Sequence, residues 1–461
     1  MAEHTIIMET TLRKLLAEKK YATLREILVT MNPSDIAAIF NELEEDRLPL
    51  LYRLLPKELA ADTFVEMDQD AQELLIRGFS DSELKEVLDE LFVDDAVDII
   101  EEMPATVVRR ILSQADPEMR KSINEILRYP ESSAGSIMTT EYISLRPQMT
   151  VAEAITRIRR TGIDKETIYT CYVTKDRTLI GVVTVKDLLL CEDDDKHIED
   201  IMIEKVISVN THDDQEEVAQ MFSKYNFMAL PVVDAENRLV GIVTFDDAMD
   251  VMEEEATEDI EKMAAIIPSE KPYMSMNPFE IWKNRIPWLM LLMVSATFTG
   301  IIISHFESAL EKLVILTAFI PMLMDTAGNS GSQASVTIIR GLSLNEIEFK
   351  DIFAIIWKEA RVAVLCGISL AVACFAKIFL VDYLILKSFV GVASPFMVIA
   401  VICITLAVTV LFAKIVGCTL PLFAKKLGFD PAVMASPFIT TIVDALSLLV
   451  YFGVANIFLP I

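Results

Sequence analysis

Residues 281–461 consist of long stretches with almost no charge, separated by short charged segments. Five stretches approach or exceed the roughly 20 apolar residues that a helix needs to cross a bilayer. They lie at 286–304, at 313–339, between Arg361 and Lys377, at 388–413 and at 431–461. In lipid, a helix satisfies its backbone hydrogen bonds within one segment. The sequence therefore predicts an all-α transmembrane domain with five helices over 285–461.

Two carboxylates interrupt these stretches. Asp325 lies in PMLMDTAGNSGSQASVT (321–337), and Asp444 lies in PFITTIVDALSLLVYF (437–452). An ionised Asp at the centre of a bilayer costs about 2.5 kcal/mol or more, and neither residue has a Lys or Arg within one helical turn. Such a residue is expected to face water, a cation or a proton path. The pair therefore predicts a transmembrane cation site.

The neighbours of both carboxylates carry oxygen. Pro437, Thr440, Thr441, Asp444 and Ser447 recur at steps of three and four residues, which places one polar stripe along a helix. In the other stretch, small and polar residues follow Met324: Asp325, Thr326, Ala327, Gly328, Asn329, Ser330, Gly331, Ser332, Gln333, Ser335 and Thr337. Its glycines allow either close helix approach or a local break. Oxygen lining without His or Cys favours a hard divalent cation such as Mg²⁺, which keeps much of its water.

The charge of the chain is unevenly distributed. Its net charge is −28, but residues 1–280 hold 59 acidic and 29 basic residues, against ten and twelve in 281–461. An acidic module of this kind repels nucleic acid and attracts cations. The N-terminus does not have the pattern of a signal peptide, and Lys and Arg cluster after the second and fourth stretches. The positive-inside rule then places the N-terminus in the cytoplasm and the C-terminus outside the cell.

The first 132 residues repeat with a period of 24. Phe40, Phe64, Leu88 and Leu112 align at this spacing, as do Leu51, Leu75, Ile99 and Ile123. Two short helices per unit would form an α-solenoid over about 7–130, within an N domain at 1–132. An irregular helical bundle is the alternative.

A second repeat covers 133–198 and 199–257. SIMTTEYISL is echoed by DIMIEKVISV, and GVVTVKDLL is echoed by GIVTFDDAM. This alternation of strand and helix predicts two α/β modules, and the pattern resembles tandem CBS domains, a Bateman module. In that family the Thr and Asp after the strand hold a nucleotide ribose, here Thr184 and Asp187, or Thr244 and Asp247. An N-cap on the following helix explains the same residues equally well.

An acidic helical segment, DDAMDVMEEEATEDIE (246–261), leads toward the membrane domain through a connecting helix and linker at 258–284. Its carboxylates are paired four residues apart, which destabilises an isolated helix by a few tenths of a kcal/mol per pair. Either a cation compensates this repulsion or the acidic face is simply solvated.

Taken in order, the helical repeat, YPESSAGSIMT, the CBS pair, the acidic helix, PMLMDTAGNSGSQAS and DPAVMASPFITTIVD resemble the MgtE family of magnesium transporters over essentially the whole chain. The resemblance implies a homodimer in the cell membrane, with a pore between the subunits and hydrated Mg²⁺ bound by Asp444. Asp325, Asn329 and Gly328 would support the site or its gate, and Pro437, Thr440 and Thr441 would line it.

The resemblance also implies that the cytosolic half senses Mg²⁺ and closes the pore, and it allows ATP at the CBS pair. The matching sensor positions are Asp94, Asp95, Asp98, Asp214, Glu216, Asp247, Asp250, Glu255, Glu258 and Asp259. One position departs from the expected pattern, because Asn226 stands where an aspartate is expected.

Three alternatives remain open at this stage. The same fold could carry Co²⁺, Mn²⁺ or Ni²⁺, or exchange a cation for Na⁺. An ATP-driven pump would need a phosphate-binding loop or a D-K-T-G motif, and the sequence contains neither. A non-conducting receptor would have no reason to bury Asp325 and Asp444. We expect a transporter rather than an enzyme.

Overall fold

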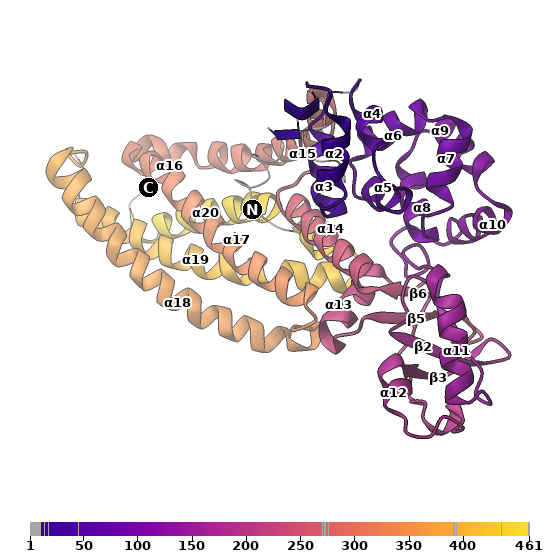
Figure 1. The fold of residues 1–461 in the computed structure, drawn as a ribbon. Coiled ribbons are helices and arrows are strands. Elements are labelled where there is room, and N and C mark those ends of the chain that lie inside the picture. Colours follow the sequence, from indigo (N-terminus) through magenta and orange to yellow (C-terminus); the bar gives the residue numbers. More distant parts are fainter. Residues whose placement is uncertain are drawn as a thin grey trace. The chain divides into compact units, whose positions relative to one another are not determined.

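The computed structural model describes residues 11–459 except 13, 17, 45, 270, 272, 275, 391, 393 and 435. Residues 7–10 of the predicted solenoid and residues 460–461 of the last predicted membrane stretch lie outside the described residues. The chain divides into two compact units, one up to Met252 and the other from Glu253. Figure 1 shows the order of their elements.

The N-terminal part is a stack of short helices. Their bounds are α2 (Tyr21–Leu28), α3 (Pro33–Asn41), α4 (Leu48–Tyr52), α5 (Lys57–Val65), α6 (Gln69–Gly78), α7 (Asp81–Leu88), α8 (Val93–Glu102), α9 (Ala105–Gln114) and α10 (Pro117–Ile126). The helices α3, α5, α7 and α9 begin 24 residues apart, and each of them packs on the one before it in this series. The aligned Phe40, Phe64 and Leu88 are all buried. The regular stacking agrees with the predicted repeat rather than with an irregular bundle.

Two α/β halves follow. The first contains β1 (Ile143–Leu145), α11 (Val151–Thr161), β2 (Thr170–Lys175), β3 (Thr178–Thr184) and α12 (Val185–Leu190), and the second contains β4 (Val209–Asn210), α13 (Gln215–Tyr225), β5 (Ala229–Val233), β6 (Leu239–Thr244) and α14 (Phe245–Met263). In each half the first strand pairs parallel with the second, and the second pairs antiparallel with the third. The two halves share one topology, as their sequence echo predicts.

Each echoed methionine packs on the glycine of the other half. A Cβ on Gly241 would lie 2.6 Å from Met138 Sδ, and a Cβ on Gly181 would lie 2.5 Å from Met202 Sδ. Any larger residue at either position would therefore collide with a side chain from the other repeat. This exchange explains why both motifs recur together in the sequence.

The YPESSAGSIMT segment joins the helical repeat to the second α/β half. Ala134 N donates to Asp213 O at 2.8 Å, and Gly135 N donates to Thr211 O at 3.0 Å. A Cβ on Gly135 would lie 2.5 Å from the Tyr129 ring and 2.8 Å from Thr211 O, so only glycine fits. The core of the repeat continues into buried residues of the second half such as Phe222.

The second unit holds the long helices. Their bounds are α15 (Pro278–His305), α16 (Glu307–Lys312), α17 (Ile320–Ser343), α18 (Ile352–Lys377), α19 (Pro395–Lys426) and α20 (Ser436–Phe458). A 3₁₀ helix (Val314–Phe319) precedes α17, a π-helix (Ile378–Ile385) extends α18, and a 3₁₀ turn (Pro431–Met434) precedes α20. Among the described residues, four segments are long and apolar enough to cross a membrane: Pro278–His305, Phe349–Ile385, Pro395–Lys426 and Pro431–Phe458.

The helix α19 packs against both α17 and α18, while α17 also packs against α20 (Figure 1). Close approach of α17 and α19 depends on two glycines, because a Cβ on Gly417 would overlap the carbonyl oxygen of Gly331. In contrast, α15 contacts α20 yet has no buried residue. The interior of this unit is therefore built around α17, α19 and α20.

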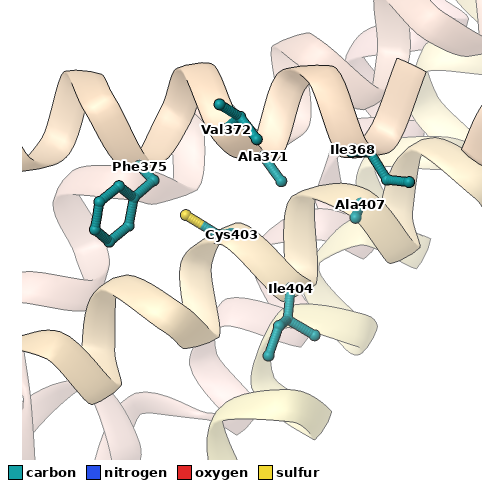
Figure 2. A pocket seen from close by; sticks show the side chains of 7 residues that line it. All are labelled: Ile368, Ala371, Val372, Phe375, Cys403, Ile404 and Ala407. Atoms are coloured by element: carbon teal, nitrogen blue, oxygen red, sulfur yellow. The ribbon is translucent and has the colours of Figure 1, made fainter. Parts of the chain in front are cut away.

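An apolar groove of about 370 Å³ lies between α18 and α19. Figure 2 shows its walls, with Phe375 and Val372 on α18 and Cys403 and Ile404 on α19. No charged side chain lines it. Its chemistry is therefore that of hydrocarbon, and it is not a candidate cation site.

Three details differ from the sequence-based expectation. Five crossing helices were predicted, but α17, which contains most of the second predicted stretch, is not among the four candidate spans found in the described residues. The predicted option of a local break at Gly328 and Gly331 is wrong, since α17 runs through both residues as a continuous helix. In addition, the fourth apolar stretch was expected to end at 413, but α19 continues to Lys426 with Lys414 buried inside it. Helix packing explains the last two differences. Residues of α19 and α20 fill the space beside Gly328 and Gly331, and Glu359 lies close to the buried Lys414.

Candidate functional site

The two membrane carboxylates lie on adjacent helices, and glycine brings those helices together. Gly328 on α17 faces α20, where a Cβ would lie 3.1 Å from Thr440 Cγ2 and 3.8 Å from Asp444 Oδ1. Asp325 is one helical turn before Gly328, within Coulombic range of Asp444. The structure thus brings together Asp325, Gly328, Thr440 and Asp444, as the polar patterns of the two stretches suggested.

The hydroxyls beside Asp444 are held by the helix itself. Thr440 Oγ1 donates to Pro437 O at 2.9 Å, and Thr441 Oγ1 donates to the same oxygen at 3.1 Å. Each hydroxyl donor is therefore used inside α20, and its lone pairs are left to accept hydrogen bonds from elsewhere. Water bound to a cation is a donor of that kind. This side of α20 can therefore accept hydrogen bonds from a hydrated ion.

One face of α17 is polar and exposed. Among the described residues of this helix, Leu323, Ala327, Ala334 and Ile338 are buried. The opposite face is exposed over its length, and it carries Pro321, Asp325, Asn329, Gln333, Val336, Thr337 and Arg340 at steps of three and four residues. The predicted Asn329 thus shares a face with Asp325 and not with the packed Gly328. A polar stripe of this kind needs water or another protein surface against it.

A charged pair missing from the sequence-based prediction lies between α18 and α19. Lys414 Nζ lies 3.7 Å from Glu359 Oε2, and the two side chains are only 6% and 14% exposed. Within the described residues, that glutamate oxygen has no hydrogen-bond partner. The signal was present in the sequence, because an isolated lysine inside an apolar helix needs a carboxylate close by.

A second group of carboxylates gathers in the first unit. Asp94 and Asp95 are at the start of α8, and Asp247 is in the first turn of α14. Glu141 accepts from Val93 N at 3.1 Å and from Thr139 Oγ1 at 2.9 Å, which fixes it beside α8. Glu166 N donates to Glu141 O at 3.1 Å. We call these five residues, together with Asp246, the carboxylate cluster.

Burial and mutual repulsion disfavour ionisation of four members of the carboxylate cluster, namely Asp94, Asp95, Glu166 and Asp247. Desolvation raises the pKa of Asp95 to about 7, and the charge of Asp247 adds to this rise. Desolvation likewise raises the pKa of Glu166 to about 8, with a contribution from Asp95. The pKa of Asp247 rises to about 6, again mainly through burial. A cation at this position would relieve both effects.

Asp94 is the most buried member of the carboxylate cluster. It is 6% exposed, its Oδ1 has no hydrogen-bond partner among the described residues, and desolvation with the nearby charge of Asp247 raises its pKa well above the ordinary value. A buried unpaired carboxylate is costly. Among the described residues, no group of three or more Asp, Glu, His or Cys has the arrangement of a metal site. The cluster is therefore an anionic environment without a preformed cage.

Of the other predicted sensor residues, Asp250 lies near enough to the carboxylate cluster for its charge to raise the pKa of Asp247. Asp98 is exposed on α8, and Asp214 caps α13 by accepting from Glu216 N at 2.8 Å. Asp250 and Glu255 lie further along α14. Within the second unit, Glu258 pairs with Lys262 at 2.6 Å and Asp259 accepts from Ser343 Oγ at 3.5 Å. Glu141, Glu166 and Asp246, which the sequence-based prediction missed, join Asp94, Asp95 and Asp247 instead.

Both Thr/Asp pairs form helix caps. Thr184 Oγ1 donates to Asp187 Oδ2 at 2.5 Å and accepts from Asp187 N at 3.1 Å, and Thr244 Oγ1 donates to Asp247 Oδ2 at 2.5 Å. The two pairs differ in access, because Asp187 is exposed whereas Thr244 is buried. The N-cap interpretation therefore describes both pairs. The first pair is therefore the more accessible of the two.

Asn226 has a backbone role. It ends α13 in the left-handed conformation, with φ +56° and ψ +45°. Asn is one of the few residues that adopt this conformation readily. The side chain at this position therefore terminates a helix, whatever else it contributes.

Comparisons with known proteins agree along the whole chain. Models of the MgtE divalent cation transporter (320–454), the MgtE intracellular N domain (31–132) and the CBS domain (134–192 and 198–254) all match. The chain is 36% identical to the magnesium transporter MgtE of Thermus thermophilus, over 98% of both chains. It is 33% identical to the magnesium transporter MgtE of Bacillus subtilis, over 96% of both.

The solved structures that match include two soluble parts of magnesium-transporting proteins, each covering about half of this chain. One is the cytosolic domain of the Mg²⁺ channel MgtE in complex with ATP, at 38% identity and a TM-score of 0.50, covering 53% of this chain and 99% of that one. The other is the soluble part of a magnesium transporter, at 33% identity and a TM-score of 0.51, covering 55% and 99%. Matches to inosine-5′-monophosphate dehydrogenases involve the CBS domains alone.

Proposed function

The chain belongs to the MgtE family of magnesium transporters, and from this premise we propose that it forms a homodimeric, Mg²⁺-gated channel of the cell membrane. The proposed subunit spans the membrane five times, with its N-terminus in the cytoplasm and its C-terminus outside. It transports Mg²⁺ and catalyses no reaction. Flow is passive in this proposal, since the sequence contains no motif for coupling to ATP hydrolysis.

The exposed polar face of α17 supports the dimeric pore most directly. Asp325, Asn329 and Gln333 are exposed on one helix that packs among membrane-spanning neighbours. Lipid cannot satisfy these side chains, and exposing them to it would cost several kcal/mol. A second copy related by a two-fold axis would place the same face opposite itself and enclose a wet path. In the dimer, water in this path would therefore solvate the polar face of α17.

Asp444 is the proposed ion-binding residue. Mg²⁺ loses water reluctantly, so one carboxylate from each subunit, with Thr440 and Thr441 accepting from bound water, would hold it hydrated. Gly328 allows α17 to approach this point, and Asp325 adds negative charge one turn away. Pro437 holds both threonine hydroxyls in place. Asp325 and Asn329 are therefore proposed as supporting or gating residues rather than primary ligands.

The carboxylate cluster is the proposed Mg²⁺ sensor. Burial and the repulsion of neighbouring carboxylates raise the pKa of Asp95 to about 7 and that of Glu166 to about 8, so these two groups resist ionisation near neutral pH. Mg²⁺ would neutralise them and stabilise the packed arrangement, and each ion can shift the equilibrium only by its differential affinity. Asp247 belongs both to this cluster and to α14, whose last residues contact the membrane-domain helices. High internal Mg²⁺ would in this way close the pore.

We also propose that the CBS pair binds ATP, as in the related cytosolic domain that was solved with ATP. Thr184 and Asp187 are the accessible pair, and Asp187 Oδ1 remains available to a ribose hydroxyl because Oδ2 serves the helix cap. ATP would act as a regulatory ligand in this site.

Flux measurements in proteoliposomes test the pore. We expect Asp444→Asn to reduce Mg²⁺ flux at least about tenfold, which corresponds to about 1.4 kcal/mol of ion stabilisation. The control is Glu311→Gln, which changes an exposed carboxylate in the short helix α16. Equal flux in Asp444→Asn and wild type would refute the pore assignment. A larger flux for Mn²⁺ or Co²⁺ than for Mg²⁺ would favour the other divalent cations.

The same preparation tests the sensor separately. Internal Mg²⁺ is expected to suppress flux in wild type, and the suppression should weaken in Asp95→Asn. Flux that ignores internal Mg²⁺ in wild type would refute the gating proposal and leave the pore assignment standing.

A further inference from the structure

Near the end of the connecting helix α14, Lys262 forms an ion pair with the segment between the membrane-domain helices α19 and α20. Lys262 Nζ lies 2.6 Å from Glu258 Oε1 on its own helix and 2.7 Å from Asp430 Oδ2 in the segment between α19 and α20. The lysine side chain is 23% exposed, so the bridge is partly shielded from solvent and salt. One ammonium thus joins a carboxylate on each side of the contact.

Asp430 is held in place independently of Lys262. Its Oδ1 accepts from Ala432 N at 2.8 Å and so caps the 3₁₀ turn that leads into α20. Ser335 Oγ of α17 donates to Met434 O in the same turn at 3.4 Å. The lysine therefore binds a carboxylate that is rigidly attached to the two helices carrying Asp325 and Asp444.

Packing accompanies the charge bridge. Met263, next to Lys262, packs against Ile339 of α17 and Ala432 of the 3₁₀ turn, which are 2% and 0% exposed. One turn earlier, Asp259 accepts from Ser343 Oγ. Beyond the helix, Ile267 N donates to Asn284 O at 2.9 Å, which returns the linker to α15. The contact is thus a fitted junction of apolar, neutral polar and charged interactions.

We propose that Lys262 is a positioning residue that seats the connecting helix on the cytoplasmic end of the pore, its ammonium serving as a built-in cation between Glu258 and Asp430. The inference rests on the proposed Mg²⁺-gated channel. At this contact the chain itself supplies the positive charge between two carboxylates. Lys262 therefore lowers the Mg²⁺ concentration at which the pore closes.

The test is the dependence of flux on internal Mg²⁺ in the full-length protein in proteoliposomes. Lys262→Met keeps most of the side-chain length and removes the charge. We expect its half-closing Mg²⁺ concentration to rise about fivefold or more, a typical coupling between sites, while flux without internal Mg²⁺ stays unchanged. Lys262→Arg is expected to close as wild type does. Lys271→Met, an exposed lysine in the following linker, is the matched control.

Asp430→Asn tests the other side of the bridge. It should raise the half-closing concentration in the same direction, and combining it with Lys262→Met should add little, because both remove one interaction. A wild-type closing curve in Lys262→Met and in Asp430→Asn would overturn the proposal. If Lys262→Met does not fold, Asp430→Asn alone decides. Loss of Mg²⁺-dependent closing in wild type itself would instead refute the gating function.

Discussion

Gly328 of α17 lies against Asp444 of α20, where a Cβ on the glycine would come within 3.8 Å of the carboxylate oxygen Oδ1. The absence of a side chain at Gly328 thus determines how closely α17 approaches the side of α20 that carries Asp444. The same glycine would place a Cβ 3.1 Å from Thr440 Cγ2. Helix separation at this point is therefore set by residue size.

Gly328→Ala is expected to lower Mg²⁺ flux several-fold. The added methyl group must displace Thr440, since a separation of 3.1 Å is shorter than ordinary carbon–carbon contact. Gly453→Ala on α20 is the matched control, because a Cβ there meets nothing within 4 Å. Flux assays on both variants give the comparison. Equal flux in the two would mean that close approach at Gly328 is not needed for conduction.

Lys414→Met is expected to destabilise the membrane domain by roughly 3–5 kcal/mol, because it leaves Glu359 buried without a counter-charge. The double variant Lys414→Met/Glu359→Gln should recover most of that loss. Thermal unfolding in detergent measures both. A single variant as stable as wild type would show that Glu359 is solvated or protonated in place.

Asp94→Asn is expected to raise the unfolding temperature in the absence of Mg²⁺ and to reduce the additional stabilisation that Mg²⁺ provides. The substitution removes charge from a buried carboxylate whose Oδ1 has no partner among the described residues. Asp70→Asn, at an exposed position of α6 in the same domain, should change neither quantity. An unchanged Mg²⁺ response in Asp94→Asn would remove this residue from the sensor.

The affinity of the carboxylate cluster for Mg²⁺ is expected to rise between about pH 6 and about pH 8. Within this range, binding of the ion should release protons. The raised pKa values of Asp95 (about 7) and Glu166 (about 8) mean that bound protons compete with the metal in this range. Calorimetry in two buffers of different ionisation enthalpy counts the protons. The Asp95→Asn variant should release fewer protons on binding Mg²⁺ than wild type. An affinity that does not change with pH would contradict the prediction.

The same pKa shifts determine how stability depends on pH without Mg²⁺. A carboxyl group whose pKa is higher in the folded state binds more protons folded than unfolded. The contribution of Asp95 and Glu166 to the free energy of unfolding is therefore greatest below their unfolded pKa of roughly 4. It is lost as the pH rises to about 8. We expect the metal-free unfolding temperature to fall from pH 6 to pH 8, and saturating Mg²⁺ to reduce the fall.

Much of the architecture could be predicted from local patterns. The 24-residue period became stacked helices with Phe40, Phe64 and Leu88 buried, and the echoed motifs became two halves with one topology. Such patterns are readable because burial imposes a regular spacing on apolar residues within each element. Asp325 and Asp444 could also be singled out from the sequence, because a carboxylate is unusual within an apolar stretch.

The sequence by itself thus determined the helical repeat, the paired α/β halves, the apolar helices and the two carboxylates that interrupt them. Only the tertiary structure decided that Gly328 serves close packing within a continuous helix, that Glu359 accompanies Lys414, and that Glu141 and Glu166 join Asp94 and Asp247. These relationships connect residues far apart in the chain. Periodicity records which face of an element is buried, but not which distant side chain it meets, because that depends on how the elements pack.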